Sequence, residues 1–219
     1  MRVKQKPGDR GSLKFMQRIV SQRPDVLNER LAARGIVTTG ADIRWVSPRE
    51  DDDWAEYRDG AFLEKLGRSD LAPALSAFWP AQGPQWDALG IAGNTLLLVE
   101  AKAHIGELAS NCAATSTRSL EMIKSALDST KRALGVTVDT DWLTGYYQLA
   151  NRIAHLEFLR RHGADAQLVM LQFTGETGMP TPSTRAAFDA AFARAMEQLN
   201  ISGNVPGMTR VYVDVADIA

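Results

Sequence analysis

Two apolar segments joined by a glycine-asparagine pair place the strongest constraint on the fold of this chain. Residues 95–102 are apolar almost without interruption, as expected of a strand covered on both faces, and residues 85–91 form a second segment of the β type. Gly93-Asn94 between them matches a two-residue hairpin loop of type II′, because glycine supplies the positive φ of the first central position. The sequence therefore predicts an antiparallel hairpin with a defined register.

The predicted register brings three charged residues to one face of the hairpin. A two-residue loop pairs Ala92 with Thr95, and counting back along both strands pairs Asp87 with Glu100. Opposed residues of an antiparallel pair share a face, with Cβ atoms about 4.5–5.5 Å apart. Lys102 lies two residues beyond Glu100 and therefore projects from the same face. We expect a charged patch on an otherwise apolar hairpin.

Two carboxylates this close need an electrostatic partner. At about 5 Å and an effective dielectric constant of about 20, they repel each other by roughly 3 kcal/mol. A raised pKa, the ammonium group of Lys102 or a bound cation would each offset this cost. Mg²⁺ suits the pair because it takes one or two carboxylates together with water and substrate phosphate, and we expect Mn²⁺ to substitute for it. The simpler alternative is a surface ion pair of Glu100 and Lys102 at a strand end.

Asp87, followed after the hairpin by Glu100-Ala101-Lys102, resembles the signature of the PD-(D/E)XK superfamily of restriction-endonuclease-like nucleases. The resemblance covers about residues 47–173, which show the order of helix, hairpin, helix and strand found in that fold. It implies a mixed central sheet that begins with a β-hairpin and is flanked by helices, in an α/β/α sandwich.

The same resemblance implies an activity. The superfamily's proline directly before the aspartate is absent here, although Pro84 is close by. A matching nuclease would hydrolyse phosphodiester bonds of nucleic acid, DNA first among them. Asp87 and Glu100 would bind Mg²⁺, and Lys102 would position water or stabilise the transition state. Some members have lost activity, so a catalytically inactive module that binds nucleic acid or protein is the alternative.

Five further residues are candidates for the site. The resemblance implies a third acid from the helix before the hairpin, and we expect Glu64 ahead of Glu56 because it lies nearer the end of that helix. Gln148 and Arg152 are one turn apart on the polar face of a long helix and could reach a substrate phosphate, although an exposed helix face explains them equally well. His104 follows the signature strand and is a candidate substrate contact, or simply a hydrogen-bonded histidine.

The remaining elements complete a mixed α/β pattern, because strands separated by helices follow the hairpin. Apolar spacing and capping signals predict helices at 12–34 with a break near Pro24, 48–66, 69–79, 117–134, 141–161 and 183–199. Further strands are predicted at 43–46, 167–173 and 209–215, and a loop at 174–182.

Composition is that of an ordinary globular protein. The 219 residues are 45% hydrophobic and 23% charged, which predicts one nuclease-like domain with a helical extension at about 1–40. The first 24 residues hold seven basic residues and one acid, whereas the whole chain has a net charge of −1, so a basic N-terminal segment is a candidate phosphate contact. Cys112 is the only cysteine, which excludes disulfides within the chain. We expect a cytoplasmic protein with no membrane partner, and we allow for a homodimer.

Overall fold

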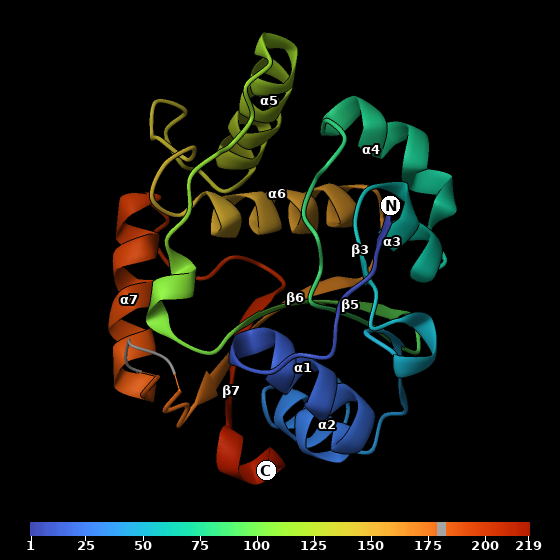
Figure 1. The fold of residues 1–219 in the computed structure, drawn as a ribbon. Helices are drawn as coiled ribbons and strands as arrows, with labels where there is room; N and C mark the ends of the chain where they lie inside the picture. Colours follow the sequence, from blue (N-terminus) through green and yellow to red (C-terminus); the bar gives the residue numbers. More distant parts are fainter. Residues whose placement is uncertain (179–182) are drawn as a thin grey trace.

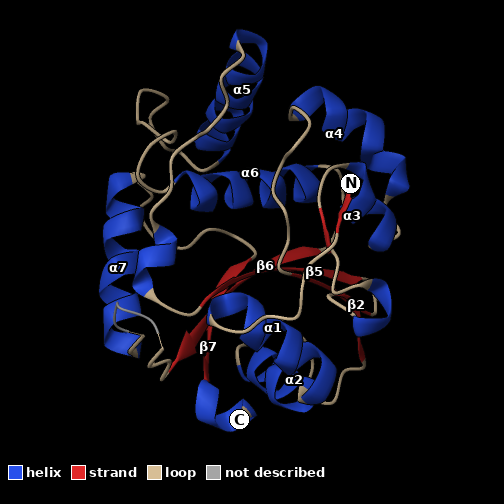
Figure 2. Cartoon of the chain, viewed as in Figure 1, coloured by secondary structure: helices blue, strands red, loops and turns tan. Residues whose placement is uncertain are grey.

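The computed structural model describes residues 1–178 and 183–219 and has a five-stranded mixed sheet at its centre (Figures 1 and 2). The order is β2-β4-β5-β6-β7, in which the first two pairs are antiparallel and the last two are parallel. The strands are β2 (Ile43–Ser47), β4 (Ala88–Ala92), β5 (Thr95–Lys102), β6 (Ala166–Thr174) and β7 (Met208–Asp214). Helices cover both faces, so the predicted mixed α/β sandwich is confirmed.

The hairpin of β4 and β5 has the predicted register. Ala92 pairs with Thr95 and Ala88 pairs with Val99. Gly93 has a φ of 58°, the positive value that the predicted turn requires at its first central position. The local turn chemistry was therefore sufficient to fix the alignment of the two strands.

Helices α1 (Gly11–Gln22) and α2 (Pro24–Ala33) cover one face of the sheet. They pack with Leu97, Val99 and Ala101 of β5 in one continuous apolar cluster. The predicted helices and the break at Pro24 are present, but they form a layer of the sandwich rather than a peripheral extension.

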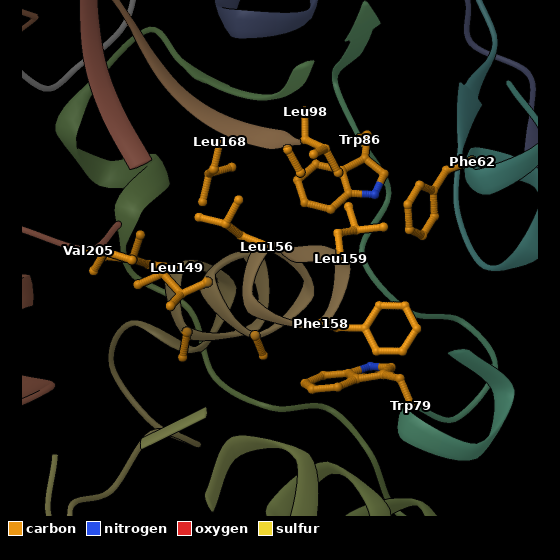
Figure 3. Close-up of a cluster of buried hydrophobic side chains, with 14 of the residues drawn as sticks. Phe62, Trp79, Trp86, Leu98, Leu149, Leu156, Phe158, Leu159, Leu168 and Val205 are labelled. Carbon is orange, nitrogen blue, oxygen red and sulfur yellow. The ribbon is translucent and has the colours of Figure 1, made fainter. Parts of the chain in front are cut away.

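The opposite face packs against α6 (Tyr147–Arg161), which crosses the sheet with α5 (Thr117–Ala133) above it (Figure 1). Leu98 and Leu168 from the sheet meet Leu156 and Leu159 of α6, as Figure 3 shows. Helices α3 (Gly60–Lys65) and α4 (Ala72–Phe78) extend this layer at one end and α7 (Arg185–Gln198) at the other. Because side chains alternate along a strand, Glu100 and Lys102 also project toward α6.

The single helix predicted for residues 48–66 is wrong. A short 3₁₀ turn, η1 (Glu50–Asp52), leads to strand β3 (Glu56–Tyr57), which pairs with β1 (Arg2–Val3) at the N-terminus. Positive φ values of 52° to 54° at Asp53, Trp54 and Asp59 interrupt the helix on both sides of β3. This strand depends on a partner more than 50 residues away, which local spacing does not reveal.

Two other boundaries differ from the prediction. The long helix begins at Tyr147 instead of residue 141, because the side chain of Asp141 accepts hydrogen bonds from the Leu143 amide and the Thr144 hydroxyl and Gly145 has a φ of 78°. The loop predicted at 174–182 lies partly outside the described residues, which omit 179–182.

The remaining short elements are 3₁₀ turns: η2 (Ser69–Leu71), η3 (Ile105–Leu108) and η4 (Val215–Ile218). Within the described ranges, no helix has both the length and the apolar composition to cross a membrane.

Candidate active site

The last pair of the hairpin is Ala88 with Val99, so Glu100 lies within β5 whereas Asp87 lies in a bend just before β4, which begins at Ala88 and not at the predicted residue 85. Asp87 Oδ2 accepts a hydrogen bond of 2.7 Å from the backbone amide of Ala101, which ties the aspartate to the neighbouring strand. Burial, followed by the charges of Glu100 and Glu56, raises the pKa of Asp87 well above its ordinary value. The two carboxyl groups therefore interact electrostatically, while their direct cross-strand pairing stays a prediction.

Glu100 is 1% exposed and forms an ion pair through each carboxylate oxygen. Lys102 Nζ lies 2.5 Å from Oε1, and Arg152 Nε lies 2.6 Å from Oε2. Burial alone would raise the pKa of Glu100, but Arg152 and Lys102 outweigh it and lower that pKa. Burial would likewise lower the pKa of Lys102, yet Glu100 and Asp87 raise it. Both groups are therefore charged at neutral pH.

Helix α6 supplies the polar residues that cover this patch. Gln148 Oε1 accepts a hydrogen bond of 2.8 Å from Lys102 Nζ. Arg152 also donates to the carbonyl of Gln85 at 2.7 Å, and its guanidinium lies 4.9 Å from the centre of the Trp86 ring. Both predicted helix residues thus join the cluster, but Arg152 is buried against Glu100 and does not lie on an exposed face.

The third acid of the cluster is Glu56, not the preferred candidate Glu64. Glu56 lies on β3 and accepts hydrogen bonds from the side-chain amides of Gln5, at 3.0 Å, and of Gln85. Burial raises its pKa, and Glu100 adds to the shift. Glu64 is exposed on α3 and lines a surface hollow with Arg2, so the structure places it apart from these contacts.

His104 lies just beyond β5, with Nε2 3.6 Å from Glu107 Oε1. Glu107 also accepts a hydrogen bond of 2.6 Å from the backbone amide of Ala103. His104, the predicted substrate contact, therefore lies near the end of β5. Its neighbour Glu107 also joins η3 to that strand through the Ala103 amide.

Sequence reasoning missed three glutamines. Gln5 and Gln85 bind Glu56, and Gln172 lies directly beside Lys102 in the parallel pairing of β5 with β6. Gln172 Oε1 is buried without a hydrogen-bond partner among the described residues, although buried polar atoms are nearly always paired. A polar residue within an otherwise apolar buried strand was the available signal for Gln172, whereas nothing local signals Gln5.

The charges and oxygen donors of the cluster decide whether it can hold a metal ion. The cluster has three acids, Glu56, Asp87 and Glu100, against two bases, Lys102 and Arg152, which leaves one negative charge uncompensated when all are ionised. Across the described ranges, no group of three or more His, Cys, Asp and Glu side chains is arranged to hold an ion. Two carboxylates with water in the other positions still fit Mg²⁺, which keeps several waters in most sites.

Comparison with known proteins gives no relative: no protein-family model, no curated protein and no solved structure matches this chain. The resemblance to PD-(D/E)XK nucleases therefore remains a prediction from the sequence. The interpretation of the site depends on its own geometry and chemistry.

Proposed function

We propose that the protein is a metal-dependent nuclease that hydrolyses phosphodiester bonds, with Asp87 and Glu100 as ligands of Mg²⁺ or Mn²⁺. The observation that supports this proposal is the charged cluster itself: Asp87 precedes β4, the charge of Glu100 acts on it, and Glu100 pairs with Lys102 two residues further along β5. Burial and, after it, the charge of Glu100 raise the pKa of Asp87, so ionising this second carboxyl group is costly in the metal-free protein. A divalent cation bound to both carboxylates would offset this cost.

A metal ion bound there would polarise a phosphoryl group and lower the pKa of the attacking water. The chain's own residues would do the rest. Lys102 would place a positive charge where negative charge develops on the phosphate, and Gln148 orients its ammonium group. Arg152 holds Glu100 in place and neutralises it in the metal-free protein.

The proposed partner is nucleic acid, and DNA is the substrate to test first. Arg2 and Lys4 are engaged by Asp53, whereas Lys6 and Arg10 are exposed and form no ion pair within the described part of the chain. Both follow Gln5, which contacts Glu56, so these two cations lie on the segment that reaches the cluster. Exposed lysine and arginine beside a site supply the salt-dependent attraction to phosphates.

The test is cleavage of single-stranded and double-stranded DNA and of RNA with Mg²⁺ or Mn²⁺. Asp87→Asn and Glu100→Gln should lose nearly all activity because each removes a proposed metal ligand. Lys102→Met should cut about 10²–10³-fold more slowly, as expected for loss of one electrostatic stabiliser. Glu64→Gln is the matched control, since it neutralises an exposed acid outside the cluster. Loss of activity in Glu64→Gln but not in Asp87→Asn would contradict the proposal.

One observation favours a second candidate, an inactive binding module. Both oxygens of Glu100 are already engaged by cations, so the cluster is partly neutralised without metal. This candidate predicts DNA or RNA binding with no cleavage under any metal, and binding that survives Glu100→Gln. The cytoplasmic location and the homodimer stay predictions, and light scattering in solution would test the latter.

A further inference from the structure

A cavity of about 380 Å³ lies between α4, the first turn of α5 and the middle of α6. Pockets of about 300–1,000 Å³ are the size that small organic ligands use. Trp79 and Leu75 line it from the α4 side, and Met122 lines it from α5. Figure 3 shows Trp79 beside Phe158 at the edge of the apolar core, so the wall is held by close packing.

His155 gives this cavity a polar group inside an aromatic wall. The side chain is 1% exposed and its ring centre lies 4.8 Å from that of Trp79. Nδ1 lies 2.8 Å from the carbonyl of Asn151, so Nδ1–H donates and Nε2 is left as an acceptor. No hydrogen bond to Nε2 comes from the described residues. Burial lowers the pKa of His155 to about 3, which keeps the ring neutral at physiological pH.

The mouth of the cavity is suited to an anion. Arg118 and Ser119, from the first turn of α5, line it. The side chain of Ser116 accepts from the Ser119 amide, but the amides that precede it have no intrahelical acceptor. Arg118 is exposed and enters no ion pair within the described ranges. A helix N-terminus with an adjacent guanidinium is a site that phosphate groups occupy.

We propose that this cavity binds one nucleotide unit, with the base against Trp79 and an N–H of the base donated to His155 Nε2. The phosphate then lies at the first turn of α5 beside Arg118. Asp59 also lines the cavity; its oxygens accept from the Gly83 amide at 2.9 Å and the Gln82 amide at 3.3 Å, and their remaining lone pairs favour a base rich in N–H donors such as guanine. Aromatic stacking of this kind is tolerant of sequence and is common in proteins that bind single strands.

The cavity is connected to the acidic cluster by packed side chains. The ring centres of Trp86 and His155 are 6.3 Å apart, and the guanidinium of Arg152 lies over the same tryptophan while it pairs with Glu100. Occupancy by a nucleotide of a substrate strand, which rests on the proposed nuclease function, would hold that strand beside the cluster. A free nucleotide would present the same chemistry.

Binding is measured by NMR titration of metal-free protein with guanosine 5′-monophosphate, guanosine, and a short single-stranded oligonucleotide that has one deoxyguanosine among thymidines. The 15N resonance of His155 Nε2 should shift on saturation with the mononucleotide. His155→Phe keeps a ring but loses the acceptor, and should weaken binding about tenfold. Arg118→Gln should weaken the monophosphate about tenfold and leave guanosine unchanged.

Ser76→Trp fills the cavity from α4 and should abolish binding, whereas Ala77→Trp adds the same side chain at the adjacent exposed position and should not. If the oligonucleotide also binds and Ser76→Trp abolishes that binding, the ligand is a unit of a strand. If only the mononucleotide binds, the ligand is a free nucleotide. No shift of His155 with either probe, or binding unchanged by Ser76→Trp, would overturn the proposal. Failure of cleavage by the wild-type protein would leave this result untouched.

Discussion

Glu100 accepts one ion pair through each of its carboxylate oxygens, from Lys102 and from Arg152. A buried charge with two partners is tolerated because its desolvation is repaid by close, hydrogen-bonded contacts, but removing one partner leaves the charge poorly compensated. Asp87 differs, because within the described ranges its side chain accepts a hydrogen bond from the backbone amide of Ala101 alone. The pKa of Glu100 is therefore lowered, whereas the pKa of Asp87 is raised.

Arg152→Met is predicted to destabilise the fold strongly. Loss of a buried charge partner costs about 3–5 kcal/mol. The matched control is Arg161→Met on the same helix, where the partly exposed pair with Glu157 should cost no more than about 1 kcal/mol. Urea unfolding measures both free energies. Equal losses in the two variants would show that Arg152 does not compensate a buried charge.

Asp87→Asn is predicted to stabilise the metal-free protein at neutral pH. The folded-state pKa of Asp87 is raised, so its contribution is favourable below the ordinary aspartate pKa of about 3.9 and is lost as pH rises through the raised value. Asparagine can still accept from Ala101 but cannot ionise. The stability difference between variant and wild type should therefore vanish at pH 3 and grow above pH 4. A difference independent of pH would contradict this assignment.

The elements differ in how far the sequence could specify them. The hairpin was predicted with its register because Gly93-Asn94 and the apolar pattern are local signals. Strand β3 was not predicted, since its hydrogen bonds go to β1, and the placement of Glu56 was missed with it. Helix α6 was predicted with the wrong start, and the exposed helix face that was the alternative explanation for Gln148 and Arg152 is wrong for Arg152, which is buried and paired with Glu100 of β5.

Gly93→Ala is predicted to weaken the hairpin without altering its packing. An alanine Cβ would meet no atom within 4 Å, so the cost is that of the positive φ alone, about 1–2 kcal/mol. The free energy of unfolding measures it. Because that strain falls on the turn between the strands that lead to Asp87 and Glu100, cleavage should fall as well; an unchanged stability would mean that the turn is not of the described type.

At the scale of the whole molecule, the sandwich brings four separate segments to one buried cluster. The hairpin supplies Asp87, Glu100 and Lys102, α6 supplies Gln148 and Arg152, β3 supplies Glu56, and the N-terminal segment supplies Gln5. The fold class and the acidic pair were predictable from local patterns. The meeting of the four segments at the cluster was not predictable, because it depends on hydrogen bonds between residues 46 to 52 positions apart in the sequence.

The central claim is that Asp87 and Glu100 together hold a divalent cation. Crystals soaked in Mn²⁺ test it most directly, because the ion is located by its anomalous scattering. We predict a peak in contact with both carboxylates at about 2.0–2.3 Å, so that Glu100 Oε2 contacts the ion as well as Arg152. Crystals of Asp87→Asn should show no peak at this position. Mn²⁺ bound elsewhere in the crystal, with Glu100 still closed by Lys102 and Arg152 and no density between the two acids, would contradict the account.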